Sequence, residues 1–405
     1  MRHLRTDVAI IGGGLVGCWT AYFLRRRGVA VTLLDKGEIG AQSSGVNFGN
    51  LRLQGRYPGQ IPLALRAHHE WEKIVEHLGD RCEFEQTGHL YIAFDGVQLA
   101  KLESQAVDGR RCGLKVEMLD LAQARSRWPW LGNGIVGGSW SARDATANPR
   151  LVAPAAARAA RRLGAEILSG TRVVTLARGN ERFRLETDRE LAIECEALVN
   201  AAGAWGAELA AVFGETVPLF SAGPPQFVTD PVPYFIAPSV QAADGTVIFR
   251  QIPRGNVIVA GYPRGASDPV ANRAPVDPSR TLATMRRLVE VAPRLATASV
   301  IRVWSGIEGY LPDLLPIIGK SHTTSGLTHA FGFCGHGFQL GPGIGLVLSE
   351  LIVDGATPTP LSDFDIARFE GQVVEDERLA KEFDGASPSA ARRRSGPVAN
   401  ARSPI

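Results

Sequence analysis

A glycine-rich turn close to the start of the chain constrains the fold more than any other feature. Residues 8–11 are a continuous apolar run, typical of a parallel strand buried on both faces. Gly12, Gly14 and Gly17 follow as G-x-G-x-x-G and lead into a stretch with apolar residues at helical spacing. A second apolar run then ends in Asp35, 18 residues after the last glycine. This order predicts a βαβ unit that binds a dinucleotide.

Each residue of this motif has a physical reason. Gly12 permits a tight turn, and Gly14 lets the backbone approach a pyrophosphate at the N-terminus of the helix. Gly17 permits close packing of the helix on the strand. The carboxylate of Asp35 would accept hydrogen bonds from ribose hydroxyls. The motif alone leaves both NAD and FAD open.

Two later stretches favour FAD. Residues 39–56 form a loop of small residues that carries Ser43, Ser44, Asn47 and Gly49 soon after the ribose acid. Such a loop suits a second pass along a pyrophosphate and the near side of an isoalloxazine ring, whereas a nicotinamide enzyme would more often begin its next helix here. A distant apolar strand ends in a second glycine-rich turn, "NAAGAWG". Two such strand ends directed at one ligand fit the long FAD molecule better than NAD.

Charge and composition limit the partners of the chain. The formal net charge is +3, but residues 385–405 contain four arginines and no acid, so the remainder carries −1. The body is therefore not basic, and nucleic-acid binding is not expected. No apolar run approaches the roughly 18 residues of a membrane span. Five scattered cysteines without a CxxC pair argue against a disulfide framework and favour a cytoplasmic protein. The composition of residues 383–405 predicts a disordered tail.

These motifs together resemble the D-amino-acid oxidase family of FAD-dependent oxidoreductases, which includes sarcosine oxidases, glycine oxidase and the flavin subunits of opine and D-hydroxyproline dehydrogenases. The resemblance covers about residues 5–375. It rests on six stretches in the family's order: "VAIIGGGLVG" with Asp35, "SSGVNFGN", "GTRVV", "LVNAAGAW", "VWSGIEGYLPDLLPIIG" and "GFCGHGFQLGPGIG".

The resemblance implies an α/β fold. A Rossmann-type FAD-binding domain with a mostly parallel sheet would be interleaved with an α+β substrate domain built on an antiparallel sheet. The implied FAD-binding domain comprises residues 1–80, 146–214 and 326–382, and the substrate domain residues 81–145 and 215–325.

The resemblance also implies how FAD is held. Val173 would lie against the adenine, and Ala201, Gly203 and Trp205 beside the pyrophosphate and flavin. The segment from Gly335 would follow the pyrimidine end of the flavin, where a helix beginning near residue 341, with a proline in its first turn, would direct free N–H groups at the ring. The full set of expected cofactor contacts is Gly12, Gly14, Gly17, Asp35, Lys36, Ser43, Ser44, Asn47, Gly49, Val173, Ala201, Gly203, Trp205, Gly335, His336, Gly337, Phe338 and Gln339.

A metal site at Cys334 and His336 is the alternative reading of this late glycine-rich segment. No second Cys–His pair lies at a useful spacing. His322, His329 and His336 are seven residues apart but are separated by glycine breaks, so they cannot share one helix face. No metal is therefore expected.

The chain departs from relatives at three positions. Gly306 stands where some oxidases attach the flavin through a cysteine, so FAD is expected to be non-covalent. Val259 stands where some sarcosine oxidases have a lysine that helps oxygen react, which favours electron transfer to a partner subunit. Glu308 stands where glycine oxidase has the arginine that clamps the substrate carboxylate. It could face an amine or guanidinium, or pair with Arg302. The remaining candidates for binding the substrate are Arg52, Arg250, Tyr262 and Gln339.

The resemblance implies the reaction. An amino acid or secondary amine, such as D-hydroxyproline or an opine, would lose a hydride to flavin N5 and become an imine, and orientation over the ring would replace a strong base. A self-sufficient oxidase that makes hydrogen peroxide from glycine, sarcosine or a D-amino acid is the enzymatic alternative. A flavin subunit that only relays electrons in a complex is the non-catalytic one.

Overall fold

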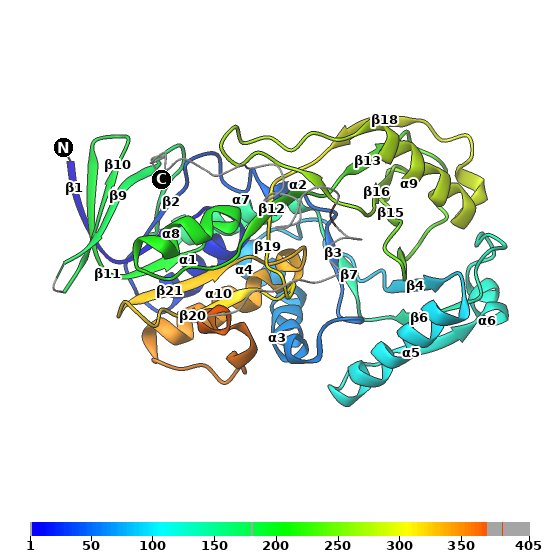
Figure 1. Cartoon of the computed structure of the whole chain (residues 1–405), viewed down its shortest axis with the longest axis horizontal. Helices are drawn as coiled ribbons and strands as arrows, with labels where there is room; N and C mark the ends of the chain where they lie inside the picture. The colour runs from blue at the N-terminus through cyan, green and yellow to red at the C-terminus, as the bar shows by residue number, and fades with distance from the viewer. Residues whose placement is uncertain (1, 180, 371–382, 384–405) are drawn as a thin grey trace.

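The computed structural model describes residues 2–179, 181–370 and 383, and it contains two sheets of eight strands each (Figure 1). The strand order of the first sheet is β20-β21-β11-β1-β2-β8, with β10 and β9 attached beside β11. β1 pairs in parallel with β2 and β11, and the parallel pairing continues to β8 and β21. Its strands are β1 (Arg2–Ile11), β2 (Val31–Leu34), β8 (Glu166–Leu168), β9 (Val173–Arg178), β10 (Phe183–Thr187), β11 (Leu191–Asn200), β20 (Ile317–Lys320) and β21 (Leu327–Phe331). The predicted mostly parallel sheet is confirmed.

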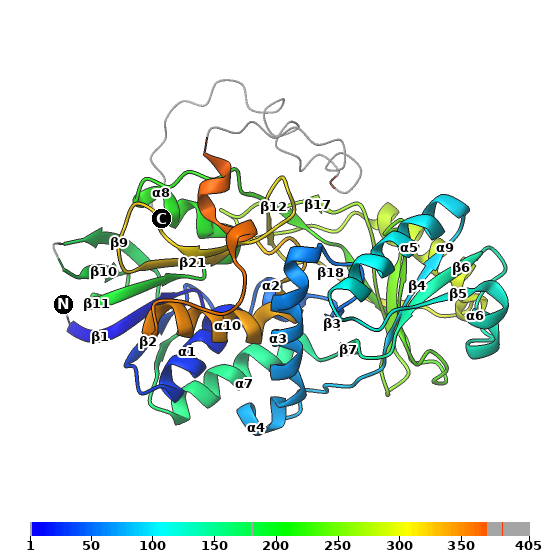
Figure 2. The same ribbon diagram turned by 90° about the horizontal axis from the view of Figure 1, so that it is seen from below.

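Helices cover both faces of this sheet (Figure 2). Along β1 the side chains alternate, because Val8 and Ile10 enter one core and Ala9 enters the other. The first core is shared with α1 (Leu15–Arg26), α3 (Ile61–Glu72), α4 (Ile74–Leu78), α7 (Pro149–Arg162) and α10 (Gly337–Val353). The second core is shared with β9, β10 and α8 (Gly206–Val212). Strands buried on both faces explain the unbroken apolar runs of the sequence.

The second sheet is almost entirely antiparallel, which confirms the expected α+β region. Its order is β18-β13-β16-β15-β14-β4-β6-β5, and only the pair β14 and β4 is parallel. The strands are β4 (His89–Ala93), β5 (Glu117–Asp120), β6 (Gly137–Ser141), β13 (Gln226–Thr229), β14 (Ser239–Ala242), β15 (Ile248–Gln251), β16 (Val257–Ala260) and β18 (Val300–Trp304). Helices α5 (Gly96–Arg111), α6 (Leu121–Arg127) and α9 (Pro278–Val291) accompany it.

Short elements join the two sheets. β3 (Asn50–Leu51) pairs with β7 (Ala145–Thr146), and β12 (Phe220–Gly223) lies between β17 (Gly265–Ala266) and β19 (Glu308–Tyr310). The remaining elements are α2 (Ser43–Val46), η1 (Pro58–Gln60), η2 (Gly203–Trp205), η3 (Pro293–Leu295), η4 (Ser362–Phe364) and η5 (Ile366–Phe369). Within the described ranges, none of the helices has the length and apolarity needed to cross a membrane.

Two expected boundaries differ from the structure. β20 falls in the stretch assigned to the substrate domain, yet it pairs with β21 at the edge of the first sheet. Phe383, assigned to the disordered tail, is buried and packs against Phe220 and Tyr310. That part of the tail prediction is wrong because one aromatic side chain fills an apolar gap, which composition does not reveal. Residues 384–405 and 371–382 lie outside the described residues.

The glycines of α10 create its contact with neighbouring helices. A Cβ on Gly341 would lie 2.5 Å from Leu15 Cδ2, and one on Gly345 would lie 2.6 Å from the carbonyl carbon of Trp19. Both distances are too short for real carbon contacts, so only glycine lets α10 lie this close to α1. The late glycine-rich segment therefore serves helix packing in its second half.

We expect Gly345→Ala to lower the free energy of unfolding by about 1–3 kcal/mol, because the added methyl group meets backbone atoms of α1 that cannot rotate away. Denaturant titration of the purified chain measures the change. Gly96→Ala is the matched control, since a Cβ on this glycine of α5 meets no atom within 4 Å. Equal losses in the two variants would contradict the packing explanation.

Candidate functional site

One elongated cavity collects most of the residues that the sequence singled out. Of the expected cofactor contacts, it is lined by Gly12, Gly14, Asp35, Lys36, Ser43, Ser44, Asn47, Gly49, Val173, Ala201, Gly203, Trp205, Gly335, His336, Gly337 and Phe338. Of the expected substrate contacts, it is lined by Arg52, Tyr262 and Glu308. Gly17, Arg250 and Gln339 are not among its lining residues.

The first turn has the geometry that the motif predicts. Gly12 has a φ of +114°, and a Cβ there would lie 2.2 Å from the carbonyl oxygen of Ala201. A Cβ on Gly17 would lie 2.0 Å from the carbonyl oxygen of Gly12. Gly17 therefore sets the packing of helix on turn, as expected, and does not face the cavity. The two strand-end turns, after β1 and after β11, touch through backbone atoms.

The N-terminus of α1 is free to bind an anion. The helix has no acidic residue in its first turn, and its N-cap, Gly14, offers no side chain. The Leu15 N–H donates to Ser44 Oγ at 2.8 Å, which ties the second loop to the helix. Because unpaired N–H groups and the helix dipole both favour negative charge, this end of the cavity fits a pyrophosphate.

Asp35 follows β2 and is held by the same turn. Its carboxylate oxygens accept from the N–H groups of Gly13 and Gly37, each at 2.7 Å. Burial raises the pKa of Asp35, and the two N–H donors counteract this effect. A carboxylate has about four acceptor sites, so two remain for ribose hydroxyls.

The Lys36 ammonium group packs against the ring of Trp205, and both residues line the cavity. The Lys36 Nζ lies 3.4 Å from the centroid of the Trp205 ring, and the Trp205 Nε1–H donates to the Pro269 carbonyl at 3.3 Å. Burial, together with Arg172, lowers the pKa of Lys36 to about 8. The cation–π contact joins the segment after β2 to η2.

Within the small-residue loop, Ser43–Val46 form one helical turn, α2, and the Asn47 side chain caps its C-terminal end. Asn47 Nδ2 donates to the carbonyl oxygens of Ser43 and Ser44, both at 2.9 Å, and its Oδ1 accepts from the Gly49 N–H at 2.8 Å. Two side chains of the second sheet also hold this turn. Gln226 Nε2 and Trp304 Nε1 both donate to the Val46 carbonyl, at 2.8 and 2.9 Å.

The late segment differs from the prediction in where its helix begins. α10 begins at Gly337, not near residue 341, so its free N–H groups belong to residues 337–339. The proline at 342 lies inside the helix. Gln339 is not among the lining residues of the cavity, so its side chain is not placed to contact the substrate as expected. Its side chain turns away and donates to the Ala64 carbonyl of α3 at 2.9 Å, because this helix face is buried against α3.

Arg250 is also misplaced by the prediction. Its Nε donates to the Phe48 carbonyl at 3.0 Å and its Nη2 to the Ala147 carbonyl at 3.3 Å. The guanidinium lines a second, smaller cavity together with Glu83 and Glu85. Burial lowers its pKa to about 10. Arg250 therefore supports the loop just before Gly49 from the side away from the main cavity, and it does not line that cavity.

Two arginines four residues apart line the main cavity. Arg52, predicted, and Arg56, missed, both line it. Arg56 is buried and donates to the Arg52 carbonyl at 2.7 Å and to Gln60 Oε1 at 2.9 Å. Burial lowers the pKa of Arg56 to about 9, and Arg52 lowers it further while Asp144 opposes this. The sequence indicated Arg56 only through its position in "RLQGR", four residues after Arg52.

Glu308 has a different partner from the one considered in the sequence. Its carboxylate accepts from the Tyr310 hydroxyl, whereas Arg302 is exposed on β18. Burial raises the pKa of Glu308, and the Tyr310 hydroxyl and Arg264 counteract this. Arg264 also lines the cavity, and its guanidinium lies over the rings of Tyr262 and Tyr310, with centroid distances of 4.2 and 4.8 Å. Sequence reasoning missed Arg264 as well as the cavity-lining Gln226 and Gln241.

Of the three positions at which the chain departs from relatives, Glu308 lines the cavity, whereas Gly306 and Val259 do not. A Cβ on Gly306 would lie 2.0 Å from Val46 Cγ2, so a larger residue has no room there. Val259 points into the core of the second sheet, and its neighbour Ala260 lines the cavity instead. Val259, the position at which the lysine of some sarcosine oxidases is absent, therefore does not line the cavity, and Lys36 is the only lysine among the described residues that do. In the described part of the chain, no group of three or more candidate ligands could hold a metal.

The fold and the cavity define the class of the protein. The chain belongs to the DAO family of FAD-dependent oxidoreductases, whose family model matches residues 7–351. It is therefore an FAD-dependent oxidoreductase.

Individual relatives cover nearly the whole chain. Glycine oxidase from Geobacillus kaustophilus (strain HTA426) is 28% identical over 387 residues, which cover 92% of this chain and 99% of that protein. A subunit of opine oxidase from Rhizobium meliloti is 27% identical, with 91% of this chain and 99% of that protein covered. The crystal structure of L-proline dehydrogenase from P. horikoshii has a TM-score of 0.85 at 26% identity, covering 91% of this chain and 98% of that chain.

The residues present fit FAD. Gly12 and Gly14 leave room beside the uncapped N-terminus of α1, and Asp35 retains free acceptor sites at the end of β2. Gln226 Oε1 is buried beside the cavity and has no hydrogen-bond partner among the described residues. It is therefore available to accept a hydrogen bond from a bound molecule.

We expect Asp35→Asn to raise the FAD dissociation constant at least tenfold, because an amide can replace only one of the two acceptor oxygens. Quenching of flavin fluorescence on reconstitution measures the constant. Asp7→Asn is the matched control, since Asp7 also accepts a backbone N–H, from Ala30, but is not among the residues that line the cavity. An unchanged constant for Asp35→Asn would contradict the ribose role.

Asp144 should make stability depend on pH. Burial raises the pKa of Asp144 to about 6, although Ser141 and the Leu53 N–H donate to it. The folded chain therefore keeps a proton between pH 4 and 6 that the unfolded chain has lost, and stability falls as pH rises through this window. The contribution is about 3 kcal/mol. Denaturant titrations at pH 4 and 7 should show a smaller pH difference for Asp144→Asn, and identical differences would contradict the assignment.

Proposed function

We propose that the chain oxidises the carbon–nitrogen bond of an amino acid or secondary amine that carries a carboxylate, and passes the electrons to a partner subunit. D-hydroxyproline and opines are the leading substrates. The observation that carries this proposal is the pair of guanidinium groups, Arg52 and Arg56, at one end of the FAD cavity. The names of the relatives, which mention glycine, opine and L-proline, support this class of substrate.

The charge balance at this end supports an anionic ligand. Asp144 is the buried carboxyl that interacts with both arginines. One carboxylate balances only one of the two guanidinium groups, so positive charge remains on this part of the wall. Because unpaired charge is costly away from water, a substrate carboxylate would stabilise the site.

Acceptors on the same cavity suit the amine. Gln226 Oε1 is buried and unpartnered in the described part, and the Glu308 carboxyl also lines the cavity. We assign the arginines to the carboxylate and these oxygens to the N–H groups, so that the substrate is held in one orientation. Bound FAD supplies the two-electron acceptor for the oxidation. The cavity-lining residues of the two strand-end turns, the small-residue loop and the start of α10 are proposed to hold it without a covalent bond.

The electron acceptor is proposed from two observations. Val259 stands where some sarcosine oxidases have a lysine, and neither Val259 nor its cavity-lining neighbour Ala260 carries a charge, which disfavours rapid reaction with oxygen. The opine oxidase relative is named as one subunit of its enzyme, which supports a partner protein.

Five free cysteines support a reducing compartment, the cytoplasm. The similarity to glycine oxidase over 99% of that protein favours the second candidate, an oxidase that makes hydrogen peroxide.

The decisive experiment is anaerobic titration of the FAD-loaded chain with glycine, sarcosine, both enantiomers of proline and hydroxyproline, and opines. We expect bleaching of the flavin absorbance with a secondary amino acid. No bleaching with any compound would contradict the proposal and favour a subunit that only relays electrons. Turnover with a dye acceptor at least tenfold faster than peroxide formation in air supports a partner subunit, and equal rates would favour the oxidase.

The carboxylate assignment has its own variant. Arg52→Met should weaken the apparent affinity for the active amino acid by roughly 10- to 100-fold, because a charge-assisted hydrogen bond is lost. The amide of the same substrate should bind weakly to the native chain and be unaffected by the substitution. Arg111→Met, at an exposed position of α5, is the control. Equal affinity of acid and amide for the native chain would contradict the assignment.

A further inference from the structure

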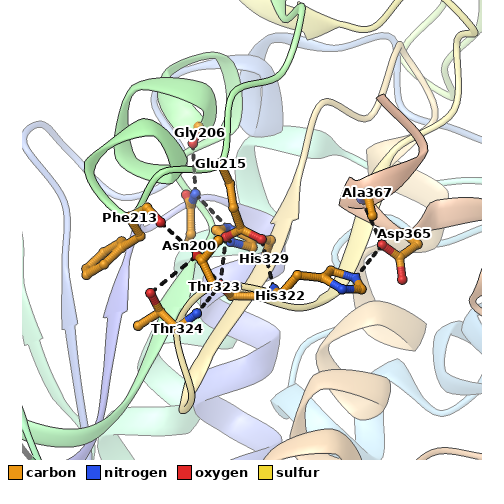
Figure 3. A network of polar contacts seen from close by, with 11 residues as sticks. Asn200, Gly206, Phe213, Glu215, His322, Thr323, Thr324, His329, Asp365 and Ala367 are labelled. Atoms are coloured by element: carbon orange, nitrogen blue, oxygen red, sulfur yellow. Dashed lines mark hydrogen bonds and ion pairs between the residues drawn. The ribbon is translucent and has the colours of Figure 1, made fainter. Parts of the chain in front are cut away.

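A chain of buried polar side chains lies behind the cofactor cavity, and no residue in it was predicted from the sequence. It begins at Glu215, passes through His329 and ends at Asn200 (Figure 3). Asn200 is the last residue of β11 and lies opposite His329 of β21 in the parallel register. Each of these strands leads into a segment that lines the cavity, residues 201–205 after β11 and residues 332–338 after β21.

Asn200 closes the first of these segments. Its Nδ2 donates to the Gly206 carbonyl at 2.8 Å, and its Oδ1 accepts from the Ala202 N–H at 3.3 Å. The amide therefore holds both ends of the turn, while Ala201, Ala202 and Gly203 line the cavity. The opposite orientation of the amide would set N–H against N–H and carbonyl oxygen against carbonyl oxygen. Only one orientation satisfies the turn.

This orientation fixes the protonation of His329. The second N–H of Asn200 Nδ2 is directed at His329 Nδ1, at 3.1 Å, so that nitrogen must be the acceptor. The proton of the ring is then on Nε2, which donates to Glu215 Oε2 at 2.8 Å. His329 is therefore a neutral imidazole in a single tautomer, and both it and Asn200 are fully buried.

Glu215 completes the chain as an acceptor. Besides His329, the Ser321 hydroxyl donates to it at 2.7 Å and the His322 backbone N–H at 2.9 Å. Burial raises the pKa of Glu215, but the hydrogen bonds from these donors outweigh burial and lower it. The carboxylate stays ionised, so it keeps the His329 proton on Nε2 and leaves Nδ1 free to accept from Asn200.

We propose that Glu215, acting through the Nε2–H tautomer of His329, is a positioning residue that orients the Asn200 amide and thereby shapes the turn of residues 201–206 against FAD. Neither Glu215 nor His329 lines the cavity. Their effect on the cofactor passes through Asn200. The inference depends on FAD binding and not on the identity of the substrate, so it can fail independently of the proposed function.

Substitutions of His329 separate relay from packing. His329→Leu should raise the FAD dissociation constant about tenfold, because Asn200 loses its acceptor. His329→Gln should restore the constant to within about threefold of the native value, since an amide offers both an acceptor and a donor. Equal constants for the leucine and glutamine variants would overturn the proposal.

The contribution of Glu215 is measured by a double-mutant cycle. Glu215→Gln should weaken FAD binding several-fold in the native chain and have no further effect in the His329→Leu background. The same loss in both backgrounds, or no loss in the native chain, would overturn the relay. His322→Gln is the control, because that exposed ring pairs with Asp365 and contributes only its backbone N–H to Glu215. It should leave FAD affinity within twofold.

A spectroscopic test on the native sequence does not depend on the folding of variants at Glu215. Long-range ¹H–¹⁵N correlation spectra of the FAD-loaded chain should contain, for His329, a ring with a protonated Nε2 and an unprotonated Nδ1. Its disappearance in the His329→Gln spectrum assigns it. A doubly protonated ring, or a proton on Nδ1, would overturn the proposal.

Discussion

The contact between two backbone turns is the constraint on which the rest of the site depends. The turn after β1 and the turn after β11 meet where a Cβ on Gly12 would lie 2.2 Å from the Ala201 carbonyl oxygen. No side chain fits between them, so the helix that follows β1 and the loop that follows β11 reach the cavity from adjacent strands. The free N–H groups of α1 and the rim around Trp205 are placed by this contact. The close approach of these two backbone turns therefore determines where the lining residues that follow them lie in the cavity.

The second sheet supports the small-residue loop of residues 39–56, which borders the cavity. Gln226 and Trp304 donate to the Val46 carbonyl, and Arg250 donates to the Phe48 carbonyl. These donors come from β13, β18 and β15, yet all three hold the small-residue loop that belongs to the first sheet. Residues 43–47 of the loop are mostly small and polar, so hydrogen bonds from the second sheet add to the rigidity of this part. Residues associated with both sheets therefore contribute to the cavity wall and to its support.

The sequence predicted features that depend on the absence of side chains. Gly12, Gly17 and Asp35 could be assigned because local spacing fixes a strand, a turn and a helix, and the structure agrees. Side chains whose direction depends on tertiary packing could not. Arg250 and Gln339 lie in stretches that reach the cavity with other residues, but their long side chains satisfy carbonyl groups behind it. The start of α10 was misjudged for a related reason, because the glycines at 341 and 345 allow two helices to touch and do not form a loop against a ring. The chain of Glu215, His329 and Asn200 was out of reach altogether, since no local pattern records hydrogen bonds between residues more than a hundred positions apart.

The order in which the cavity wall is drawn from the chain has a consequence for biosynthesis. Lining residues run from Ile11 to Phe338, and the final ones follow β21, which is inserted beside β11 only after most of the polypeptide exists. A nascent chain that has been synthesised only as far as the small-residue loop contains the glycine-rich turn after β1. It still lacks the segments after β11 and β21 that line the rest of the cavity. The ribosome must therefore extend the polypeptide as far as Phe338 before the prosthetic group can be enclosed, which makes cofactor capture a late event in maturation.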